Sequence, residues 1–363
     1  MKRKLFFCIR NFKQGGISRC LQTLLQCLDA ERYAVEVFAL DHIGPYKGNM
    51  PNCVILPEDP IIHSLQVYRK EASLKDLFFK SIRKIGLTLF RWDLLEWRFR
   101  KVAQGINCDV AIAYAEGDFT HLVQFTSAPT KIVWVHNDYR FAKESTIGTP
   151  FETFERIVCC SSSALKSFVE LYPNLNDRAI AIHNLVNVEQ IRALSLEEEN
   201  EIDRAKMVVV SIGRIDYPKH FDIIPQIAAQ LKGQIDFNWY IIGDGPQSLK
   251  EEVFRAIEKF DVSEEVHLLG SKDNPYKYLK GANVMAVTSR FECYPTVVNE
   301  ALSLGVPVVM NDIPVASEML SPENGIVTDY DHFAEAIIAA QSLKVEFVDE
   351  NEMILQQLED LMK

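Results

Sequence analysis

Short apolar runs alternate with amphipathic stretches along the first half of the chain. The runs span 5–9, 34–40, 53–56, 110–114, 131–135, 156–160 and 179–183, and residues 17–28 have the spacing of an amphipathic helix. The runs lack the strict apolar–polar alternation of a half-exposed sheet, and helical segments separate most of them. This pattern predicts parallel strands in a sheet that helices cover on both faces.

A polar, acidic stretch interrupts this alternation. Residues 194–206 include the run Glu197-Glu198-Glu199-Asn200-Glu201, and a second series of apolar runs follows at 207–212, 237–242, 266–269, 284–288, 306–310 and 325–327. At 363 residues the chain is also too long for one ordinary core. We therefore predict an α/β protein of two doubly wound, Rossmann-like domains that face one another across a cleft. The domains span 1–193 and 194–345, and a C-terminal helix over 346–363 packs back towards the first domain.

Composition and charge narrow the class of protein. The hydrophobic fraction is 48% and the charged fraction 25%, as in soluble globular proteins. A net charge of −11 argues against nucleic-acid binding. The eight cysteines form no C-x-x-C pair, so their spacing fits neither a zinc site nor a disulfide framework. Since no apolar run approaches the ~18 residues that span a bilayer, we expect a cytoplasmic protein.

Residues 61–105 differ from the rest of the chain. They hold ten Lys/Arg and four Asp/Glu, a local balance of +6, so the remainder carries −17. Aromatic and basic residues are interleaved over 75–104, from Phe78 to Phe99. Two interpretations stay open. The segment is either a helical insertion whose aromatic side chains fill the core, or an amphipathic helix that makes peripheral contact with an anionic membrane.

Two carboxylates eight positions apart bracket a turn near the C-terminal end. Glu292 follows the apolar run 284–288, Pro295 lies in the turn, and Glu300 lies on the helix that leaves it. Ligands of open α/β sheets bind at the carboxyl ends of strands, and the free amides at the start of the helix suit a phosphate. A loop carboxylate for one polyol, amides for phosphate and a helix carboxylate for a second polyol describe a sugar-nucleotide site.

Two cations follow the first strand of the second domain. Arg214 and Lys219 are five positions apart in the loop after 207–212, and Gly213 permits a tight turn there. Both side chains can converge on one diphosphate, whose departing charge otherwise needs a metal ion. A further loop, Gly243-Asp244-Gly245-Pro246, has ordinary turn chemistry, and we interpret it as structural; the alternative is that it lies near the nucleotide.

The first domain offers polar groups at equivalent places. Gly15 and Gly16 begin the first helix without the G-x-G-x-x-G spacing of dinucleotide binders, which argues against NAD. Glu116, His136 and Asp138 each follow the end of a predicted strand. His136 suits a hydrogen bond to a sugar hydroxyl, whereas Glu116 and Asp138 are candidates for contact with an acceptor.

With these pieces in order, the chain resembles the family 4 retaining glycosyltransferases, whose GT-B architecture has two facing Rossmann-like domains. The resemblance covers nearly the whole length, and bacterial surface-polysaccharide enzymes are the most similar group. Its specific element is Glu-x7-Glu with a downstream Gly-x-Pro-Val. The matching positions are Gly15-Gly16, Glu116-Gly117, residues 134–138, Gly213-Arg214, Lys219, Glu292 to Ala301, residues 305–309, Glu318 and Asn324-Gly325.

The resemblance implies roles for several of these positions. Glu292 contacts the donor sugar near the reacting centre, and His136 lies at the far edge of the sugar; we predict both as catalytic. Glu300 holds the ribose. The diphosphate is bound by Arg214, Lys219 and the backbone of Tyr294, Pro295, Thr296 and Val297, with Gly15 and Gly16 lying against the phosphates from the other domain.

The chain departs from the commonest family pattern in two places. Cys293-Tyr294-Pro295 stands where Gly-Phe-Gly is frequent, and His220 rather than glycine follows Lys219. The first departure keeps a turn. The second places the geometry of the phosphate-binding loop in question, because a glycine there permits backbone conformations that a histidine rarely adopts.

We therefore expect a retaining glycosyltransferase of the hexosyltransferase class that acts in cell-surface polysaccharide synthesis. It moves a sugar from a nucleotide diphosphate, a UDP-sugar, to a glycan or lipid-linked acceptor. We expect no metal and no cofactor, and a cytoplasmic location that extends to the inner face of the cell membrane if 75–104 binds lipid. The alternatives are a sugar-nucleotide epimerase of the same fold, which needs no acceptor, and a non-catalytic scaffold, which binds no donor. A phosphorylase would need a cofactor-binding lysine that the chain does not offer.

Overall fold

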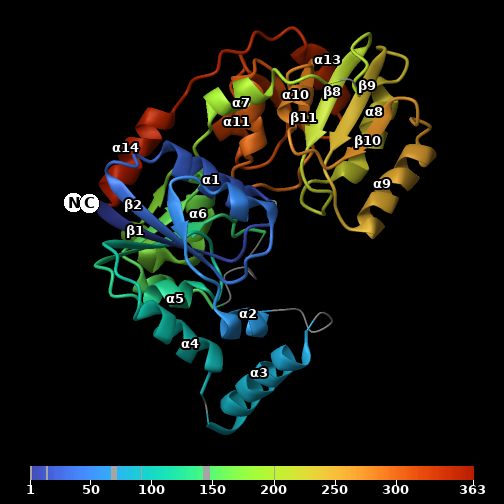
Figure 1. Ribbon diagram of the computed structural model, residues 1–363. Helices are drawn as coiled ribbons and strands as arrows, with labels where there is room; N and C mark the ends of the chain where they lie inside the picture. Colours follow the sequence, from blue (N-terminus) through green and yellow to red (C-terminus); the bar gives the residue numbers. More distant parts are fainter. Residues whose placement is uncertain (1, 14, 67–71, 91, 142–147, 200) are drawn as a thin grey trace. The chain divides into compact units, whose positions relative to one another are not determined.

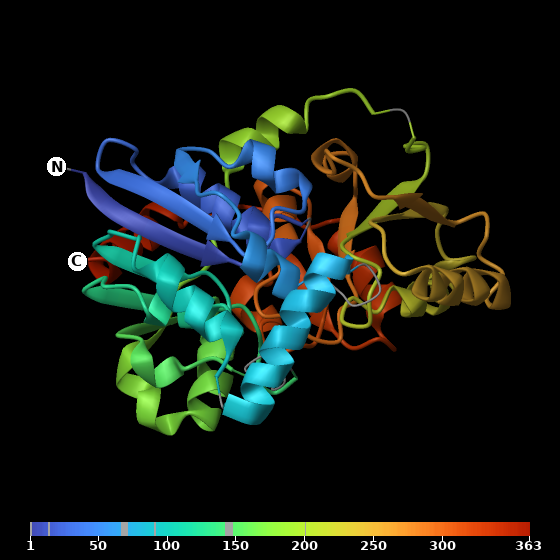
Figure 2. The same ribbon diagram turned by 60° about the horizontal axis from the view of Figure 1, so that its bottom comes forward.

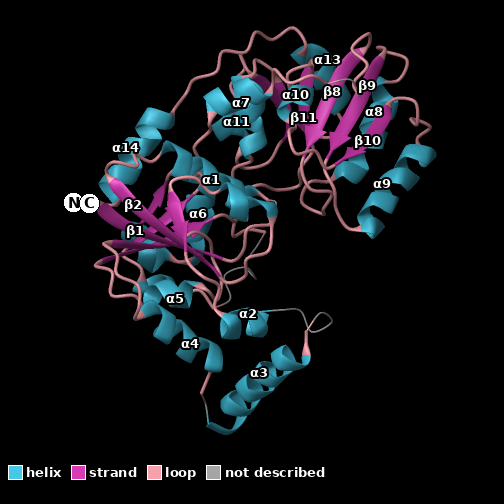
Figure 3. Ribbon diagram, viewed as in Figure 1, coloured by secondary structure: helices cyan, strands magenta, loops and turns pink. Residues whose placement is uncertain are grey.

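A computed structural model describes residues 2–13, 15–66, 72–90, 92–141, 148–199 and 201–363. The chain forms two compact units (Figure 1), one made of residues 1–185 with 352–363 and the other of residues 186–351. Each unit contains a parallel sheet with helices on its faces (Figure 3). The predicted fold class, α/β with two Rossmann-like domains, is confirmed.

The first sheet has seven parallel strands in the order β3-β2-β1-β4-β5-β6-β7. The chain adds strands outwards from β1 in one direction and then starts again at its other side with β4, so the topology reverses between β1 and β4. All seven strands were predicted from the apolar runs. Their bounds are β1 Arg3–Ile9, β2 Tyr33–Ala39, β3 Cys53–Ile55, β4 Val110–Ala113, β5 Thr130–Val135, β6 Arg156–Cys159 and β7 Ala179–Ala181.

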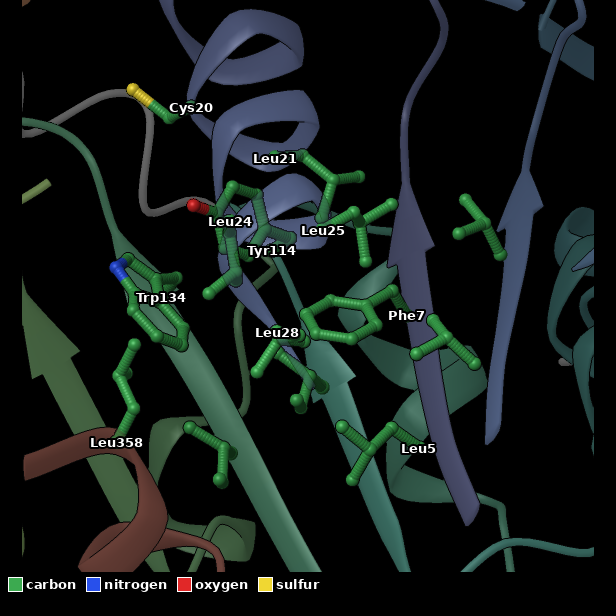
Figure 4. Packing of buried hydrophobic residues seen from close by; sticks show 14 of the residues in the cluster. Leu5, Phe7, Cys20, Leu21, Leu24, Leu25, Leu28, Tyr114, Trp134 and Leu358 are labelled. Carbon is green, nitrogen blue, oxygen red and sulfur yellow. The ribbon is translucent and has the colours of Figure 1, made fainter. Parts of the chain in front are cut away.

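The helices of the first unit lie between these strands in the sequence, except for α14 at the C-terminal end of the chain. Their bounds are α1 Gly16–Cys27, α2 Pro60–Gln66, α3 Leu74–Ile85, α4 Leu94–Ala103, α5 Thr120–Gln124, α6 Ser162–Leu171 and α14 Asn351–Leu361, and a π-helical turn spans Gly86–Phe90. The apolar face of α1 packs on side chains of the sheet, including Phe7 of β1 and Tyr114, which follows β4 (Figure 4). This packing forms the core on that face of the sheet.

The C-terminal helix α14 belongs to the first unit. Ile354, Leu358 and Met362 join the hydrophobic cluster of α1 and β1. The side chain of Arg3 donates a hydrogen bond to the backbone carbonyl of Lys363 at 3.0 Å. The apolar spacing 354–358–362 is what a helix needs to bury one stripe, and the buried stripe ties the C-terminal end of the chain to its beginning.

The second sheet has six parallel strands in the order β10-β9-β8-β11-β12-β13, and its topology reverses between β8 and β11. The predicted strands are again present. The strands are β8 Met207–Ile212, β9 Phe237–Ile242, β10 Val266–Gly270, β11 Val284–Val287, β12 Val308–Asn311 and β13 Gly325–Thr328, and the helices are α7 Val188–Leu194, α8 Ile224–Leu231, α9 Gln247–Lys259, α10 Tyr276–Leu279, α11 Thr296–Ser303, α12 Ala316–Met319 and α13 Phe333–Ala340.

The two units divide between Leu185 and Val186, eight residues before the predicted boundary. The cause is α7, whose Val188 and Ile191 are buried against Tyr276 of the second unit. The acidic stretch that suggested the boundary at 194 therefore follows α7 and lies inside the second unit. The second unit also extends to Asn351, six residues past the predicted 345, and α14 begins at that residue.

Candidate functional site

The reversal of strand order in the second unit brings two predicted loops together. Strands β8 and β11 are neighbours in the sheet, with Val209 paired to Val284 and Val210 to Met285. The loop after β8 contains Lys219 and the loop after β11 contains Glu292. Because both strands are parallel, both loops leave the same edge of the sheet, where crevices of open α/β sheets bind ligands.

Lys219 and Glu292 form an ion pair at this edge. The ammonium of Lys219 donates to Oε1 of Glu292 at 2.5 Å, and the hydroxyl of Ser289 donates to the same oxygen at 2.7 Å. The side chains of Lys219 and Glu292 are only 19% and 14% exposed. A charge pair that is this shielded from water is held more firmly than a surface pair. Two residues that the sequence placed at one donor site are therefore in direct contact.

Gly213 makes room for the stem of Lys219. A Cβ atom at position 213 would lie 3.0 Å from Cε and 3.2 Å from Cδ of Lys219. The lysine stem thus runs along the bare backbone of the glycine on its way to Glu292. The glycine of the Gly213-Arg214 motif therefore has a steric role towards Lys219.

The loop Gly243-Asp244-Gly245-Pro246, which follows β9, packs against the loop after β8 that contains Lys219. The amide of Gly213 donates to the carbonyl of Ile242 at 3.1 Å, and that of Ile215 donates to Asp244 at 2.9 Å. A Cβ at position 243 would lie 1.7 Å from the carbonyl oxygen of Gly213, and one at position 245 would lie 2.0 Å from that of Ile215. The two loops approach so closely that only glycine fits at positions 243 and 245. This agrees with a structural role for the motif.

A buried hydrogen-bond network fixes the loop that carries Glu292. The side-chain amide nitrogen of Asn311 donates to the carbonyl of Ser289 and to the hydroxyl of Tyr330, each at 3.0 Å. The hydroxyl of Tyr330 donates to the carbonyl of Thr288 at 3.1 Å, and the hydroxyl of Thr288 donates to the carbonyl of Lys219 at 3.1 Å. The network joins both loops, so it positions Glu292 and Lys219 together. Burial raises the pKa of Tyr330 to about 12, so its hydroxyl stays a proton donor.

Sequence reasoning missed Asn311 and Tyr330. Asn311 is the last residue of β12, and Tyr330 follows the end of β13. Both positions thus satisfy the criterion that selected the other candidates, which is a polar side chain at the carboxyl end of a parallel strand. That signal was present in the sequence.

His220 adopts the left-handed conformation, with φ 54° and ψ 41°. The loop thus has the backbone geometry that a glycine would permit, although a histidine occupies the position. Its ring packs edge-on against Tyr330, with 5.0 Å between ring centroids. Burial lowers the pKa of His220, and the nearby Arg290 lowers it further while Asp222 opposes the shift.

Arg214 lies in the same loop but points into solvent. Its side chain is 72% exposed, and its guanidinium lies 3.0 Å from a carboxylate oxygen of Asp216. An exposed pair of this kind contributes little to stability. The arginine therefore has the freedom to turn towards an anion, whereas Lys219 is already fixed in place.

The helix predicted after the turn at Pro295 is present. Helix α11 starts at Thr296, and Pro295 precedes it as N-cap without a side-chain hydrogen bond to the helix. Tyr294 accepts a hydrogen bond from the side chain of Asn299 at 3.0 Å, and burial raises the pKa of Tyr294 to about 12. Glu300 is buried on α11. The ribose and phosphate contacts of Glu300 and of residues 294–297 stay predictions.

In the first unit, Gly15 and Gly16 begin α1 beside the carboxyl end of β1. No described atom lies within 4 Å of a Cβ built at either glycine. Gly15 has φ 161°, an extended backbone that any residue adopts. Contacts with the described residues therefore do not require either glycine, and the predicted approach to phosphates stays a prediction.

His136, Glu116 and Asp138 follow strands β4 and β5 of the first unit. Glu116 is buried and accepts hydrogen bonds from the amide of His136 at 3.1 Å and from the side chain of Asn137 at 3.2 Å. Burial raises the pKa of the Glu116 carboxyl, and these hydrogen bonds oppose the shift. Asp138 is buried and paired with Arg140. Both carboxylates thus already have partners within the unit, and their contact with an acceptor stays a prediction.

The imidazole of His136 has a buried Nε2 that finds no hydrogen-bond partner among the described residues. Burial lowers its pKa to about 4, and a hydrogen bond with the backbone of Tyr114 partly opposes the shift. A neutral imidazole with one unsatisfied nitrogen retains the capacity for one more hydrogen bond. This property suits the predicted contact with a sugar hydroxyl.

Two Rossmann-like units, the second with cations and carboxylates at its strand reversal, form a fold of the GT-B type. Solved structures share this fold. Anabaena HepE in complex with UDP and glucose has a TM-score of 0.74 at 17% identity, covering 99% of this chain and 98% of that one. An S. aureus TarM mutant in complex with fondaparinux, alpha-GlcNAc-glycerol and UDP has a TM-score of 0.73 at 13% identity, covering 99% and 100%.

Sequence similarity agrees with the fold. Residues 195–352 match the family model described as glycosyl transferases group 1. A Campylobacter jejuni protein, N-acetylgalactosamine-N,N'-diacetylbacillosaminyl-diphospho-undecaprenol 4-alpha-N-acetylgalactosaminyltransferase, is 23% identical over 91% of this chain and 87% of its own length. The amylovoran biosynthesis glycosyltransferase AmsD of Erwinia amylovora is 24% identical over 50% of this chain and 58% of its own. Residues 195–352 are therefore similar to the group 1 glycosyltransferases.

Proposed function

We propose that the protein is a retaining glycosyltransferase that moves a sugar from a UDP-sugar to a glycan or lipid-linked acceptor in cell-surface polysaccharide synthesis. The observation that carries this proposal is the shielded Lys219–Glu292 pair at the strand reversal of the second unit. It supplies a cation for a diphosphate and a carboxylate for sugar hydroxyls at one place. The UDP in the HepE and TarM structures supports the donor, and the name of the Campylobacter relative supports a diphospho-lipid acceptor.

In the proposed reaction the second unit binds the donor. Lys219 and Arg214 neutralise the diphosphate, Glu292 accepts hydrogen bonds from the sugar, and Glu300 accepts them from the ribose. The bond between the anomeric carbon and the diphosphate oxygen breaks, and an acceptor oxygen bonds to the same face of that carbon. The proton of the acceptor hydroxyl passes to the departing phosphate oxygen. We propose that the two cations take the role that a metal ion has in other transferases.

A lipid-linked acceptor requires the reaction to take place at the membrane surface. Its hydroxyl stays at the membrane surface, so the enzyme must work there. We propose that the protein is cytoplasmic and acts at the inner face of the cell membrane.

Donor binding is the first test. UDP-, GDP-, ADP- and CMP-sugars are compared by thermal shift of the full chain, and we expect stabilisation by UDP-sugars alone. Glu292→Gln and Lys219→Met should each reduce donor turnover at least about a hundredfold. Lys206→Met, on the exposed Lys206–Asp236 pair, is the matched control and should retain turnover. Wild-type turnover in both site variants would refute the assignment of the site.

The stereochemistry is tested separately. Proton NMR of the product from a UDP-α-sugar should show an α-linkage, and a β-linkage would exclude retention while leaving glycosyl transfer intact. Incubation with donor alone distinguishes an epimerase, which would convert the donor sugar without any acceptor. If none of the sugar nucleotides stabilises the protein, a scaffold role replaces catalysis.

A further inference from the structure

Helix α3 of the first unit carries an apolar stripe that faces solvent. Leu74, Leu77, Phe78 and Ile85 are exposed and lie at helical spacing on one face, and Leu74 and Phe78 are 87% and 61% exposed. The π-helical turn that follows adds Leu87, Leu89 and Phe90, of which the last two are 70% and 73% exposed. Nine of the twenty large apolar side chains that are exposed among the described residues lie between positions 74 and 97.

Lysines border this stripe on both sides. Lys75 follows Leu74 by one position and Lys84 precedes Ile85 by one, and both lysines are exposed. At 3.6 residues per turn, they lie on opposite edges of the stripe. The one acidic residue of α3, Asp76, is buried and forms a capping box with Ser73. Its pKa is lowered to about 2 by hydrogen bonds from side chains, so it stays bound to the cap and off the exposed face.

Side-chain contacts stabilise the fold of the segment from α3 to the start of α4. The guanidinium of Arg83 donates two hydrogen bonds of 2.8 Å to the carboxylate of Asp93, which caps the next helix α4. Trp92 packs so closely on Gly86 that a Cβ there would lie 2.6 Å from its carbonyl oxygen. The apolar stripe is therefore presented on a preformed surface, and little ordering entropy is lost when a partner covers it.

Helix α4 behaves differently and anchors the segment. Leu94, Leu95 and Phe99 are buried in the first unit, and Arg98 pairs with the buried Asp59 at 2.6 Å. Figure 1 shows α3 on the far side of α2 from the first sheet, and in Figure 2 α3 comes forward. The two interpretations of 75–104, a helix that fills the core and an amphipathic surface helix, thus apply to different halves, since α4 is buried in part and α3 is exposed. Arg91 lies outside the described residues.

We propose that α3 and the π-helical turn, residues 74–90, form a docking surface for an anionic lipid bilayer. A central apolar line with lysines along both edges matches a membrane interface, where acyl chains lie below anionic headgroups. Among the described residues, no helix is long and apolar enough to cross a membrane. The surface therefore serves a protein that lies on the membrane, which agrees with the lipid-linked acceptor of the proposed function but does not depend on it.

Charge distinguishes the bilayer from other occupants. Residues 61–105 carry +6 in a chain of −11, so an anionic surface attracts this segment and repels the remainder. This difference orients the protein with α3 towards the lipid. A second copy of the chain fits poorly, because a symmetric contact through α3 would bring the same lysines together.

Vesicle flotation of the full chain tests the docking surface. Phosphatidylglycerol vesicles should carry the protein to the top of the gradient, and matched phosphatidylcholine vesicles should not. Phe78→Ser with Phe90→Ser, or Lys75→Glu with Lys84→Glu, should each lower the bound fraction at least about tenfold. The matched controls are Phe254→Ser with Met353→Ser, at exposed apolar positions elsewhere, and Lys166→Glu with Lys344→Glu; both should float like the wild type.

The outcomes separate this inference from the proposed function. Variants that no longer float should keep wild-type turnover of UDP-sugar with a water-soluble acceptor. Absence of flotation by the wild type on phosphatidylglycerol overturns the docking surface, whatever the activity. Equal flotation of site and control variants also overturns it. If the serine variants instead convert a dimer to a monomer in sedimentation, a second copy occupies the surface and the lipid proposal is wrong.

Discussion

The contact between Lys219 and Glu292 makes a prediction about stability in the absence of any donor. Lys219→Met removes the ammonium but keeps an unbranched stem of similar length along Gly213. The carboxylate of Glu292 then retains the hydrogen bond from Ser289 as its remaining partner at that oxygen. The variant therefore leaves a shielded negative charge without its counter-ion.

The expected cost follows from the burial of the pair. Breaking a fully buried pair costs roughly 3–5 kcal/mol, whereas an exposed pair is worth about 0–1 kcal/mol. Both side chains are less than one-fifth exposed, and the bond from Ser289 remains. We therefore expect Lys219→Met to lower the free energy of unfolding of the second unit by about 2 kcal/mol. Adding Glu292→Gln removes the isolated charge, so the double variant should recover about 1 kcal/mol.

Hydrogen exchange read by mass spectrometry is the appropriate assay, because a chain of two units need not unfold in one step. Peptides that contain β8 and β11 report the free energy of opening in the second unit, and peptides from β1 and β4 serve as an internal reference. Lys206→Met, which breaks an exposed pair of the same unit, should cost less than about 1 kcal/mol.

Additivity would refute this reasoning. If the costs of Lys219→Met and Glu292→Gln sum to that of the double variant within about 0.3–0.5 kcal/mol, the two side chains are not coupled in solution. A cost confined to the first unit would also be incompatible with the contact.

Three further outcomes test other parts of the structure. Tyr330→Phe keeps the ring against His220 but removes the hydroxyl that Thr288 and Asn311 share, so we expect about 1–2 kcal/mol less stability and a lower kcat with little change in KM; unchanged kcat would contradict a positioning role. Gly243→Ala places a methyl group 1.7 Å from a carbonyl oxygen and should lower the melting temperature strongly, whereas Gly48→Ala, with open space around it, should not. For His136 the native pKa is about 4 and the ordinary value 6.5, so the unfolded state binds more protons between these values. The free energy of unfolding should therefore fall by up to about 3 kcal/mol as pH drops through that window, and His136→Gln should flatten the slope measured by urea unfolding.

Strands were predictable because each has a strong local signature. A parallel strand covered on both faces is a short continuous apolar run, and β8 and β9 match their predicted bounds to the residue. The predicted position of the domain boundary was less accurate. An acidic stretch indicates residues exposed to solvent, but it does not show with which unit the neighbouring helix packs. The buried contacts of Val188 and Ile191 in the folded structure show that α7 packs with the second unit.

For residues 75–104, the sequence pattern did not predict which side chains are buried. Aromatic and basic residues alternate through both α3 and α4, so composition treats the two helices alike. Burial separates them, because Phe99 of α4 is enclosed while Phe78 of α3 is exposed. Whether an apolar side chain has a neighbour depends on residues far away in sequence, and a single sequence without known contacts does not contain that information.

The contacts that position the site could not be predicted from the sequence either, although the unusual residue His220 could be identified. Lys219 and Glu292 are 73 residues apart, and their contact follows from the order of strands, which periodicity does not reveal. His220 was identified as a departure from glycine, yet the loop still takes the left-handed conformation. That conformation costs a residue with a Cβ about 1–2 kcal/mol, and an edge-on aromatic contact such as His220–Tyr330 returns about 0.5–1.5 kcal/mol. The two terms nearly cancel, so packing with Tyr330 supports the loop geometry that a glycine would otherwise provide.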